Sequence, residues 1–418
     1  MKLNGKVTDA LNFFQGNEPH ALTREYGSPL YVYNERIFRK SCRDIKGMCE
    51  YPKFFVNYSV KANSNLTLLK IAREEGLRAD ATSQGEAVAI LAAGYQPEEI
   101  FYVVNNVSAA ELNFAVEKNI TVSVDSLSQL ETFGQLNPGK RVSVRLNPGI
   151  GAGHHEKVVT GGDRTKFGVN EAYIPDIKRI LEKYDLKLAG INQHIGSLIM
   201  DGSLFLAGVQ NLLKIARQFD DLDFIDLGGG FGVPYQKQEG EEPLDIESLG
   251  KLLSKFMHEF SESYGKELRF MVEPGRYIPA ESGVLLGTVH AIKNNGFVKY
   301  AGTDLGFSVF ARPMLYDAHH DIEVYRDSDE IMEHPIKMIN IVGNMCESGD
   351  YIARERYLPA LRVGDVLGVL DAGAYGYAMS SQYNYRARPA EVLICEDGTR
   401  KLIRRRDTYE DMLANMIF

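Results

Sequence analysis

Residues 53–83 read KFFVNYSVKANSNLTLLKIAREEGLRADATS, and this stretch sets the pattern of the chain up to about residue 275. A short run rich in aromatic and β-branched residues comes first. A longer stretch with apolar residues at helical spacing follows it, and then a second short apolar run. This order is typical of a strand, a helix and a second strand parallel to the first. We therefore expect parallel strands joined by helical crossovers.

The same alternation repeats along the chain. Eight apolar runs occur, at residues 53–61, 78–83, 100–104, 120–126, 142–147, 186–196, 222–230 and 267–275. Eight parallel strands separated by helices, over roughly 220 residues, favour an α/β fold of the (β/α)8 barrel type over an open doubly wound sheet. After about residue 283 the runs become short and β-rich, without long amphipathic stretches, which predicts a separate β domain.

Composition excludes several classes of protein. The chain has 418 residues, a net charge of −9 and only one short basic run, at residues 400–406, so nucleic acid is not expected as a partner. The first residues do not resemble a signal peptide and no stretch is long and apolar enough for a membrane helix, which predicts a cytoplasmic protein. Four scattered cysteines predict reduced thiols.

The first strand of the predicted barrel ends in a lysine. Lys61 follows the run 53–60, and the carboxyl ends of barrel strands are where active sites form. A lysine there, with its pKa depressed by burial, could bind an aldehyde cofactor covalently. The alternative is a lysine whose side chain reaches out to water.

Glycine and histidine follow the sixth and seventh strands. Gly228, Gly229 and Gly230 come directly after an apolar run, where consecutive N–H groups can converge on a phosphate. Their spacing does not match a dinucleotide or nucleoside-triphosphate loop, so a monophosphate fits better; a flexible loop is the alternative. His194 ends the sixth run and, taken alone, could be a hydrogen-bonded core residue.

The eighth strand ends in Glu273-Pro274-Gly275-Arg276. A carboxylate at this place could keep the pyridine nitrogen of pyridoxal phosphate protonated, and a structural ion pair between Glu273 and Arg276 is the alternative. A lysine, a histidine, a phosphate nest and an acid at four strand ends together form the set that a pyridoxal enzyme requires.

These motifs also resemble those of a known family, the barrel-type, alanine-racemase-like pyridoxal-phosphate decarboxylases, and within it the diaminopimelate decarboxylases. The resemblance runs from about Gly27 to the carboxyl end. It rests on six motifs: Tyr-x-x-Lys-Ala-Asn at Lys61, His-Ile-Gly-Ser at His194, Gly-Gly-Gly-Phe-Gly at Gly228, Glu-Pro-Gly-Arg at Glu273, Cys-Glu-Ser-Gly-Asp at Cys346 and Asp-Ala-Gly-Ala-Tyr-Gly at Tyr375.

The resemblance implies roles for the residues of these motifs. Lys61 would hold pyridoxal 5'-phosphate, His194 would stack on its ring and Glu273 would pair with its pyridine nitrogen. The residues expected to help bind the cofactor, mainly through its phosphate, are Ser197, Gly229, Gly230, Gly275, Arg276 and Tyr375. The implied reaction is decarboxylation of meso-2,6-diaminopimelate to L-lysine and CO2, with Cys346 or Lys61 as the proton donor to the product.

The family's architecture further implies a homodimer with shared active sites. Arg276, Arg312 and Tyr316 would bind the distal carboxylate of the substrate, with Tyr375 also at the substrate, and Cys346 and Glu347 would come from the partner subunit. The resemblance also makes the β domain discontinuous, with the barrel at residues 30–280 and the β domain at residues 1–29 and 281–418.

Two departures from the family's motifs stand out. The usual Gly-Pro before the Cys-Glu pair is Gly343-Asn344-Met345 here, and the loop after the fifth strand contains His154 and His155. Adjacent loop histidines rarely chelate one ion together, so no metal site is predicted. These departures bear on the choice of substrate and leave the cofactor assignment in place.

Rival functions are a decarboxylase for ornithine, arginine or carboxynorspermidine, an amino acid racemase, and a pyridoxal-phosphate-binding protein without catalysis. The first gives no reason for Arg276 and Arg312 to meet a distal carboxylate, and a racemase would need a second catalytic tyrosine in place of Cys346 and Glu347. A simple binder would not need the Cys346–Glu347 pair.

Overall fold

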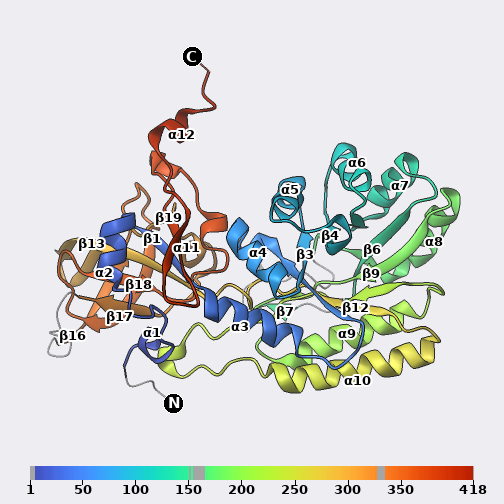
Figure 1. Cartoon of the computed structure of the whole chain (residues 1–418), viewed down its shortest axis with the longest axis horizontal. Coiled ribbons are helices and arrows are strands. Elements are labelled where there is room, and N and C mark those ends of the chain that lie inside the picture. The colour runs from blue at the N-terminus through green and yellow to red at the C-terminus, as the bar shows by residue number, and fades with distance from the viewer. Residues whose placement is uncertain (1–4, 150–151, 154–164, 327–334, 418) are drawn as a thin grey trace. The chain divides into compact units, whose positions relative to one another are not determined.

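The chain divides into two units by its internal contacts (Figure 1). The structure is a computed structural model, and the residues it describes are 5–149, 152–153, 165–326 and 335–417. The barrel unit comprises residues 39–233 and 243–278. The β unit comprises residues 1–38, 234–242 and 279–418.

Eight parallel strands of the barrel unit form a sheet that closes on itself. In ring order they are β2 (Phe54–Ser59), β3 (Arg78–Ala81), β4 (Ile100–Val103), β5 (Thr121–Val124), β6 (Arg141–Asn147), β9 (Lys187–Asn192), β11 (Phe224–Asp226) and β12 (Arg269–Val272). The ring closes because β12 pairs with β2 and β5 pairs with β6. The predicted (β/α)8 barrel is confirmed, and each of the eight apolar runs contains one of these strands.

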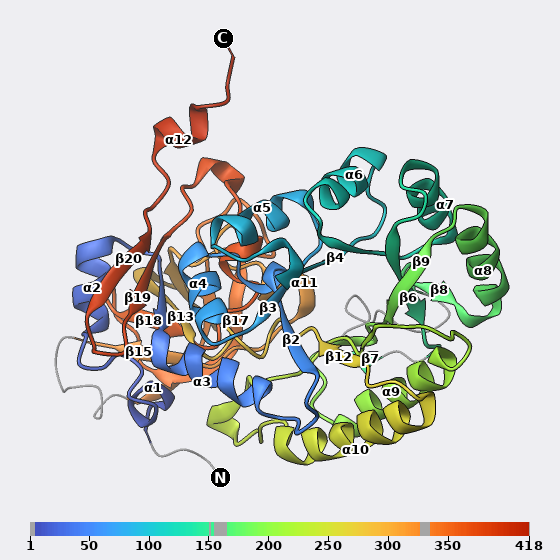
Figure 2. The ribbon, with the colours of Figure 1, turned by 45° about the vertical axis from the view of Figure 1, so that its right-hand side comes forward.

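Helices surround these strands. They are α4 (Leu66–Glu74), α5 (Gln84–Ala92), α6 (Ala109–Glu117), α7 (Leu127–Leu136), α8 (Ile174–Lys183), α9 (Gly202–Ala216) and α10 (Ile246–Tyr264), and α3 (Glu35–Lys46) precedes β2. Polar side chains begin several of them, as where Ser83 accepts from the Glu86 N–H and Asp245 from the Ser248 N–H. Figure 2 shows α9 and α10 side by side outside the strands.

The interior of the barrel changes in polarity along the strands. One part is an apolar cluster of Phe55, Phe101, Val103, Ala189, Phe224 and Met271, most of which lie in the amino-terminal half of their strands. Toward the carboxyl ends of the strands the interior is polar, because Asp80, Asp226 and Glu273 are buried there. Burying a carboxyl group costs free energy unless it is hydrogen-bonded, paired or needed for function. The carboxyl end of the strands is therefore the candidate site.

The β unit is built on a long sheet of mixed direction. Along the sheet the order is β17 (Tyr351–Pro359), β16 (Ile336–Val342), β14 (Val298–Thr303), β13 (Gly283–Asn295), β1 (Leu30–Asn34), β19 (Ala390–Ile394) and β20 (Arg400–Arg404). Two further strands, β18 (Val366–Val369) and β15 (Ile322–Tyr325), join through β13. The last helix, α12 (Tyr409–Leu413), extends away from this sheet in both views (Figures 1 and 2).

The amino-terminal segment completes the β unit, as predicted. Strand β1 is buried along its whole length between β13, to which it is antiparallel, and β19, to which it is parallel. Ahead of it, α1 (Val7–Ala10) and α2 (Pro19–Tyr26) place Val7, Phe13, Phe14 and Leu22 in the same core as Val284 and Val392. The buried Glu323 carboxylate accepts from the Val7 N–H at 2.6 Å and the Thr8 N–H at 3.2 Å.

The units differ in three places from the ranges predicted for the domains. Residues 30–38, 234–242 and 279–280 have their contacts in the β unit, although the barrel was predicted to hold residues 30–280. The local sequence of β1 gives no sign of this, because a fully buried apolar strand fits either a barrel or a sandwich. Whether the two units fold as independent domains stays a prediction.

The β-rich runs of the sequence, at residues 283–292, 337–342, 365–370, 391–395 and 401–405, correspond to β13, β16, β18, β19 and β20, whereas β1, β14, β15 and β17 were not predicted. Strand β17 contains the exposed charged residues Arg354 and Glu355 in its middle, which breaks the alternation that marks a half-buried strand. Its pairing with β16 carries two irregularities of register. Long-range pairing therefore makes a strand where the local pattern does not.

Candidate active site

Lys61 lies directly beyond strand β2, in the short 3-10 turn Val60–Ala62. The turn begins where β2 ends at Ser59, so the lysine is placed at the carboxyl end of the barrel. Its side chain is half-buried, and its positive charge lowers the pKa of the buried carboxyl groups Asp80, Asp226 and Glu273 below what burial alone would give. The one lysine thus stands among three acids.

Glu273 follows β12 and is almost wholly buried, with 4% of its surface exposed. Burial is the main cause that raises its pKa well above the ordinary value, and the neighbouring Asp226 and Asp80 add to it. Its Oε1 atom has no hydrogen-bond partner among the described residues. A buried carboxyl oxygen of this kind suits a ligand that brings its own N–H.

A set of hydrogen bonds ties the strand ends together beneath Glu273. The Ser59 hydroxyl donates to Asp80 Oδ2 at 2.5 Å and contacts the Glu273 carbonyl oxygen at 3.1 Å. Asn57 Nδ2 donates to Asp226 Oδ2 at 3.3 Å. Because these bonds join β2, β3, β11 and β12, they hold the acids in fixed positions.

The three glycines after β11 form a tight backbone turn at the strand ends. A Cβ at Gly229 would lie 1.9 Å from the Glu273 carbonyl oxygen, and one at Gly228 would lie 2.3 Å from the Gln193 carbonyl oxygen. The Gly228 N–H donates to Asp226 Oδ1 at 2.8 Å. Among the described residues the Gly230 N–H has no hydrogen-bond partner, and its φ of +107° places it in backbone that favours glycine. It can therefore donate to an anion.

His194 lies beside this turn as a neutral imidazole. Its Nδ1 accepts from the Gly229 N–H at 3.3 Å, which leaves Nε2 to carry the ring proton. Burial, together with the positive charges of Lys61 and Arg145, lowers its pKa well below the ordinary value. A neutral ring is the form that can stack on an aromatic cofactor without bringing a charge.

Arg276 and Ser197 are brought together, as the predicted cofactor site requires. An Arg276 guanidinium N–H donates to the Ser197 hydroxyl oxygen at 2.8 Å. Arg276 is 5% exposed and Gly275 precedes it in the turn after β12.

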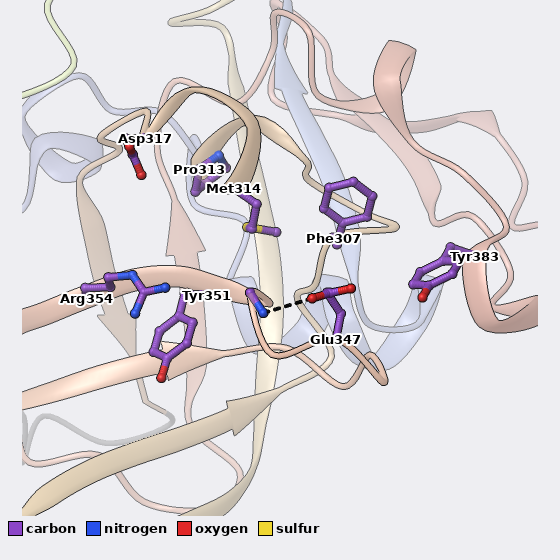
Figure 3. A pocket seen from close by; sticks show the side chains of 9 residues that line it. Phe307, Pro313, Met314, Asp317, Glu347, Tyr351, Arg354 and Tyr383 are labelled. Atoms are coloured by element: carbon purple, nitrogen blue, oxygen red, sulfur yellow. Dashed lines mark hydrogen bonds between the residues drawn. The ribbon is translucent and has the colours of Figure 1, made fainter.

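The β unit holds the remaining predicted residues. Cys346 and Glu347 are exposed in the loop between β16 and β17. Figure 3 shows this loop, where the Gly349 N–H donates to Glu347 Oε1 at 3.2 Å. Glu347, Phe307, Tyr383 and Met314 all line one pocket of about 390 Å³.

Buried Asp350 organises the Cys346–Glu347 loop. Its carboxylate accepts from the Phe307 N–H at 2.7 Å and the Met345 N–H at 2.9 Å. The Cys346 N–H donates to Asn384 Oδ1 at 3.0 Å. The loop therefore has a defined shape although its two functional candidates point to the surface.

Arg312 begins the short helix α11 (Arg312–Tyr316) and is 2% exposed. Its Nε–H donates to His320 Nε2 at 3.2 Å, and its guanidinium lies over the Tyr235 ring, 5.1 Å from the centroid. His320 Nδ1 lies 2.7 Å from the Leu370 carbonyl oxygen and must donate to it. His320 is thus a neutral Nδ1–H tautomer that holds the arginine.

Tyr375 lies in a strained segment. Both Asp371 and Tyr375 have φ of +55°, which is uncommon for residues other than glycine. Gly373 between them fits because a Cβ there would lie 1.8 Å from the Pro279 carbonyl oxygen. Strain held in place by surrounding structure is frequent at functional sites, which agrees with a ligand role for this segment.

The arrangement at the barrel mouth fits pyridoxal phosphate. The unpartnered Glu273 oxygen, the neutral His194 ring, the free Gly230 N–H and the Ser197 hydroxyl match a pyridine nitrogen, an aromatic ring and a phosphate. Lys61 supplies the amine that an aldehyde needs. Each of these groups belongs to the barrel unit.

Comparisons with known proteins agree with this geometry. The family described as "Pyridoxal-dependent decarboxylase, pyridoxal binding domain" matches residues 36–280. This chain belongs to the pyridoxal-dependent decarboxylases. Like other members of the family it uses pyridoxal phosphate.

Several relatives of this decarboxylase extend over nearly the whole chain. A diaminopimelate decarboxylase of Methanothermobacter thermautotrophicus is 41% identical over 95% of this chain and 94% of the relative. One of Escherichia coli K12 is 35% identical over 94% of both chains. A Helicobacter pylori diaminopimelate decarboxylase, solved with L-lysine, has a TM-score of 0.85, 32% identity and coverage of 94% of this chain and 98% of that one.

Sequence reasoning missed three charged residues of the decarboxylase's barrel mouth: Asp80, Asp226 and Arg145. Arg145 lies on β6 with Glu273, Asp125 and Asp80 near it; burial lowers its pKa and these acids raise it. A signal for all three was present, because each is a charged residue inside one of the predicted buried strands, where charged side chains are rare.

Two further predictions concern the histidine pair 154–155 and the absence of a membrane-spanning helix. His154 and His155 lie outside the described residues. Among the residues that the structure describes, no helix combines the length and the apolar character needed to cross a membrane.

Proposed function

We propose that this pyridoxal-dependent decarboxylase converts meso-2,6-diaminopimelate to L-lysine and CO2. The observation that carries the proposal is similarity at 41% identity, over nearly the full length of both chains, to a protein named diaminopimelate decarboxylase. The complex of the H. pylori relative with L-lysine, the product of this reaction, supports it. The carboxyl group lost would be the one on the D-configured carbon.

The barrel unit would supply all of the proposed cofactor-binding residues except Tyr375, which belongs to the β unit. Lys61 would hold it covalently, Glu273 would bind the pyridine N–H, and Ser197, Gly229, Gly230, Gly275, Arg276 and Tyr375 would help bind it, mainly at the phosphate. When bound, the cofactor supplies an electron sink for the pair left by the departing carboxylate. Ionised Glu273 would keep the ring nitrogen protonated, and the raised pKa of this carboxyl group means that a positively charged partner is needed to ionise it.

Substrate choice would depend on positive charge facing the distal carboxylate. Arg276, Arg312 and Tyr316 are the candidates, and Arg312 is preorganised because His320 and Tyr235 fix its guanidinium. Ornithine, arginine and carboxynorspermidine carry no carboxylate that corresponds to the distal group of diaminopimelate. Arginines held ready for such a carboxylate therefore favour diaminopimelate over these amino acids.

A homodimer with shared sites is part of the proposal. Cys346 and Glu347 would enter the active site of the partner subunit, where Cys346 or Lys61 would deliver the proton that replaces the lost carboxyl group. The exposed position of the loop supports this role, as do exposed aromatic side chains next to it, Tyr383 at 44% and Tyr385 at 54%. We also propose a cytoplasmic location; the four cysteines, all free thiols, agree with it.

Product analysis tests the proposed substrate. The purified holoenzyme would be incubated separately with meso-diaminopimelate, ornithine, arginine and carboxynorspermidine, and CO2 and amine products would be measured. L-Lysine should form from meso-diaminopimelate, with kcat/KM for the other three amino acids lower by about a hundredfold or more, because a buried site for a carboxylate is left unpaired without one. Comparable turnover of ornithine or arginine would refute the substrate and leave the cofactor chemistry in place.

A further inference from the structure

A second pocket lies at the amino-terminal end of the barrel strands, the end away from Lys61 and Glu273. It has a volume of about 230 Å³. Four strand starts contribute to it: Thr121 begins β5, Arg141 begins β6, Phe224 begins β11 and Arg269 begins β12. Its other lining residues are Val116, Asn119, Ile120, Lys140 and Ala189.

The charges around this pocket are all of one sign. Lys140, Arg141 and Arg269 line it, and none of its lining residues is acidic. Arg141 forms an ion pair with Asp223, which accounts for one of the three positive charges. The remaining two face the pocket without a carboxylate partner among the residues that the structure describes.

Arg269 is the most constrained of these cations. Its guanidinium lies over the Phe224 ring, 5.7 Å from the centroid, at the edge of the apolar barrel interior. Burial and then the positive charge of Arg141 lower its pKa. Two cations held near each other and partly out of water repel, and an anion between them would remove that cost.

Arg78, at the start of β3, extends the same positive region. Its guanidinium lies over the Phe55 ring at 5.6 Å, and its Nε atom is buried with no hydrogen-bond partner among the described residues. Burial lowers its pKa first and the charge of Arg269 lowers it further, whereas Glu99 and Glu98 raise it; its terminal N–H group donates to the Glu98 carbonyl oxygen. The Nε–H group of Arg78 is therefore the part of this guanidinium that is left for a further acceptor.

The simplest alternative is that these arginines only cover the apolar interior with their stems. Other cations on the same rim show what such a surface position normally looks like. Lys53 pairs with Glu267 at 2.8 Å, and Lys266 pairs with Asp221 at 2.7 Å and Asp223 at 3.1 Å. Covering side chains have no need to leave their charges unpaired around one pocket, whereas a binding site for an anion does.

We propose that this pocket binds a small oxyanion with two or more negative charges, a phosphate or a dicarboxylate, through Arg269, Lys140 and Arg141. The ligand would bridge the starts of β5, β6 and β12 and would stabilise the closed barrel by binding only to the folded chain. This site is separate from the proposed decarboxylation and does not depend on it.

The test uses the holoenzyme, so that the cofactor's own phosphate fills its place in the active site. Thermal unfolding would be followed while inorganic phosphate, and in a second series succinate, is added at constant ionic strength set by NaCl. We expect a saturable rise in Tm in one or both series. A rise with phosphate alone identifies a phosphate ligand, a rise with succinate alone identifies a dicarboxylate ligand, and a rise with both identifies a site that accepts either oxyanion.

Variants locate the effect. Arg269→Gln should weaken binding of the effective anion about tenfold or more, because it removes a charge-assisted hydrogen bond. Lys140→Gln should weaken it several-fold, and since Lys140 is exposed this variant keeps the fold even if Arg269→Gln does not. Arg179→Gln removes an exposed arginine of α8, outside the pocket, and should leave binding unchanged.

Two results would overturn the proposal. One is a Tm that follows ionic strength only, with no saturable response to either anion. The other is a response of equal size in the wild type, Lys140→Gln and Arg269→Gln proteins, which would mean that the anion binds elsewhere, for example at the arginines proposed to bind the substrate.

Discussion

At the scale of single residues, the barrel mouth contains several acidic side chains whose buried position favours the neutral, protonated form. Burial raises the pKa of Asp80, Asp226 and Glu273; the charge of Asp80 raises the pKa of Asp226 further, and Asp226 and Asp80 together raise that of Glu273. Lys61 and Arg145 offset this in part. A site with more buried acids than bases is prepared for a cationic ring nitrogen, and the free chain carries the electrostatic cost of that preparation.

The electrostatic cost of burying Asp226 can be measured in the apoenzyme as a pH dependence of its thermal stability. Burial is the main cause that raises its pKa to about 7, whereas an aspartate in an unfolded chain titrates near about 3.9. At Asp226 the folded chain then binds more protons between these values, so the contribution of Asp226 to the free energy of unfolding is fully present below about pH 4 and is lost as the pH rises to about 7. We expect the Tm of the apoenzyme to fall over this range, and Asp226→Asn to make the fall shallower.

The Asp226→Asn chain can keep its contacts. The new amide still accepts from the Gly228 N–H through its oxygen, and Asn57, whose Oδ1 is unpartnered among the described residues, can turn to accept from the new NH2 group. Asp220→Asn, at an exposed position, is the matched control and should leave the slope unchanged. An equally steep fall in Asp226→Asn would show that other groups cause it.

His320 gives a second prediction at this scale. As a neutral ring it accepts from Arg312 and donates to the Leu370 carbonyl oxygen, so it positions the arginine without touching the reacting atoms. If Arg312 binds the distal carboxylate, His320→Phe should raise KM for meso-diaminopimelate about tenfold with little change in kcat, since ground-state and transition-state binding weaken alike. Steady-state kinetics measure both constants.

The conservative variant separates positioning from general damage. His320→Gln retains an acceptor for Arg312 and should recover part of the lost affinity, which a loss of packing alone would not allow. A folded His320→Phe enzyme with the wild-type KM would show that Arg312 needs no such support or does not bind the substrate.

At the scale of elements, the turn after β11 links phosphate binding to the position of Glu273. Gly229 packs against the backbone that follows β12, and the neighbouring Gly230 carries the N–H that can donate to an anion. The close approach of two backbones fixes both groups in one arrangement. Any side chain inserted here must move the turn, the Glu273 backbone or both.

Gly229→Ala tests this coupling. The added Cβ would lie 1.9 Å from the Glu273 carbonyl oxygen, so the turn must shift. Overpacking of this kind costs about 1–3 kcal/mol, and we expect a lower Tm with cofactor affinity reduced about tenfold. Gly85→Ala, in helix α5 with no atom closer than 3.8 Å to the new Cβ, is the control and should affect neither cofactor affinity nor turnover. Unchanged cofactor affinity in Gly229→Ala would separate the turn from the phosphate.

At the scale of the whole molecule, the candidate residues are divided between the two units. Lys61, His194 and Glu273 belong to the barrel unit, whereas Cys346 and Glu347 belong to the β unit and lie at its surface. An exposed loop that carries a candidate proton donor, Cys346, and an acid, Glu347, gains a role if a second chain covers it. The proposed dimer supplies that cover.

Complementation between inactive chains tests the shared site. Lys61→Ala chains mixed with chains carrying both Cys346→Ala and Glu347→Ala should recover activity, because each heterodimer has one site with an intact Lys61 and an intact Cys346–Glu347 pair. Random pairing makes about half of the dimers heterodimers, so recovery should approach roughly a quarter of wild type. No recovery in a mixture shown by tagged pull-down to contain heterodimers would place all three residues in one chain's site.

Sequence alone determined the parts of this protein that depend on local pattern. The alternation of apolar runs and amphipathic stretches predicted the eight strands, because burial on both faces selects apolar residues wherever a strand lies. Lys61, the glycines 228–230 and Glu273 were visible because polar or flexible residues at the end of such a run are unusual. Their proposed roles came from the motifs that surround them.

Only the tertiary structure decided which distant residues meet. Closure of the ring brings Asp80, Asp226 and Arg145 together with Glu273, and no local feature of their strands states which strand lies beside which. The insertion of β1 between β13 and β19, the pairing of β17 with β16, and the contact of Arg312 with His320 are of the same kind. Whether a segment is buried can be predicted from its own residues. Which strand or side chain it contacts depends on the free energy of the whole packed chain.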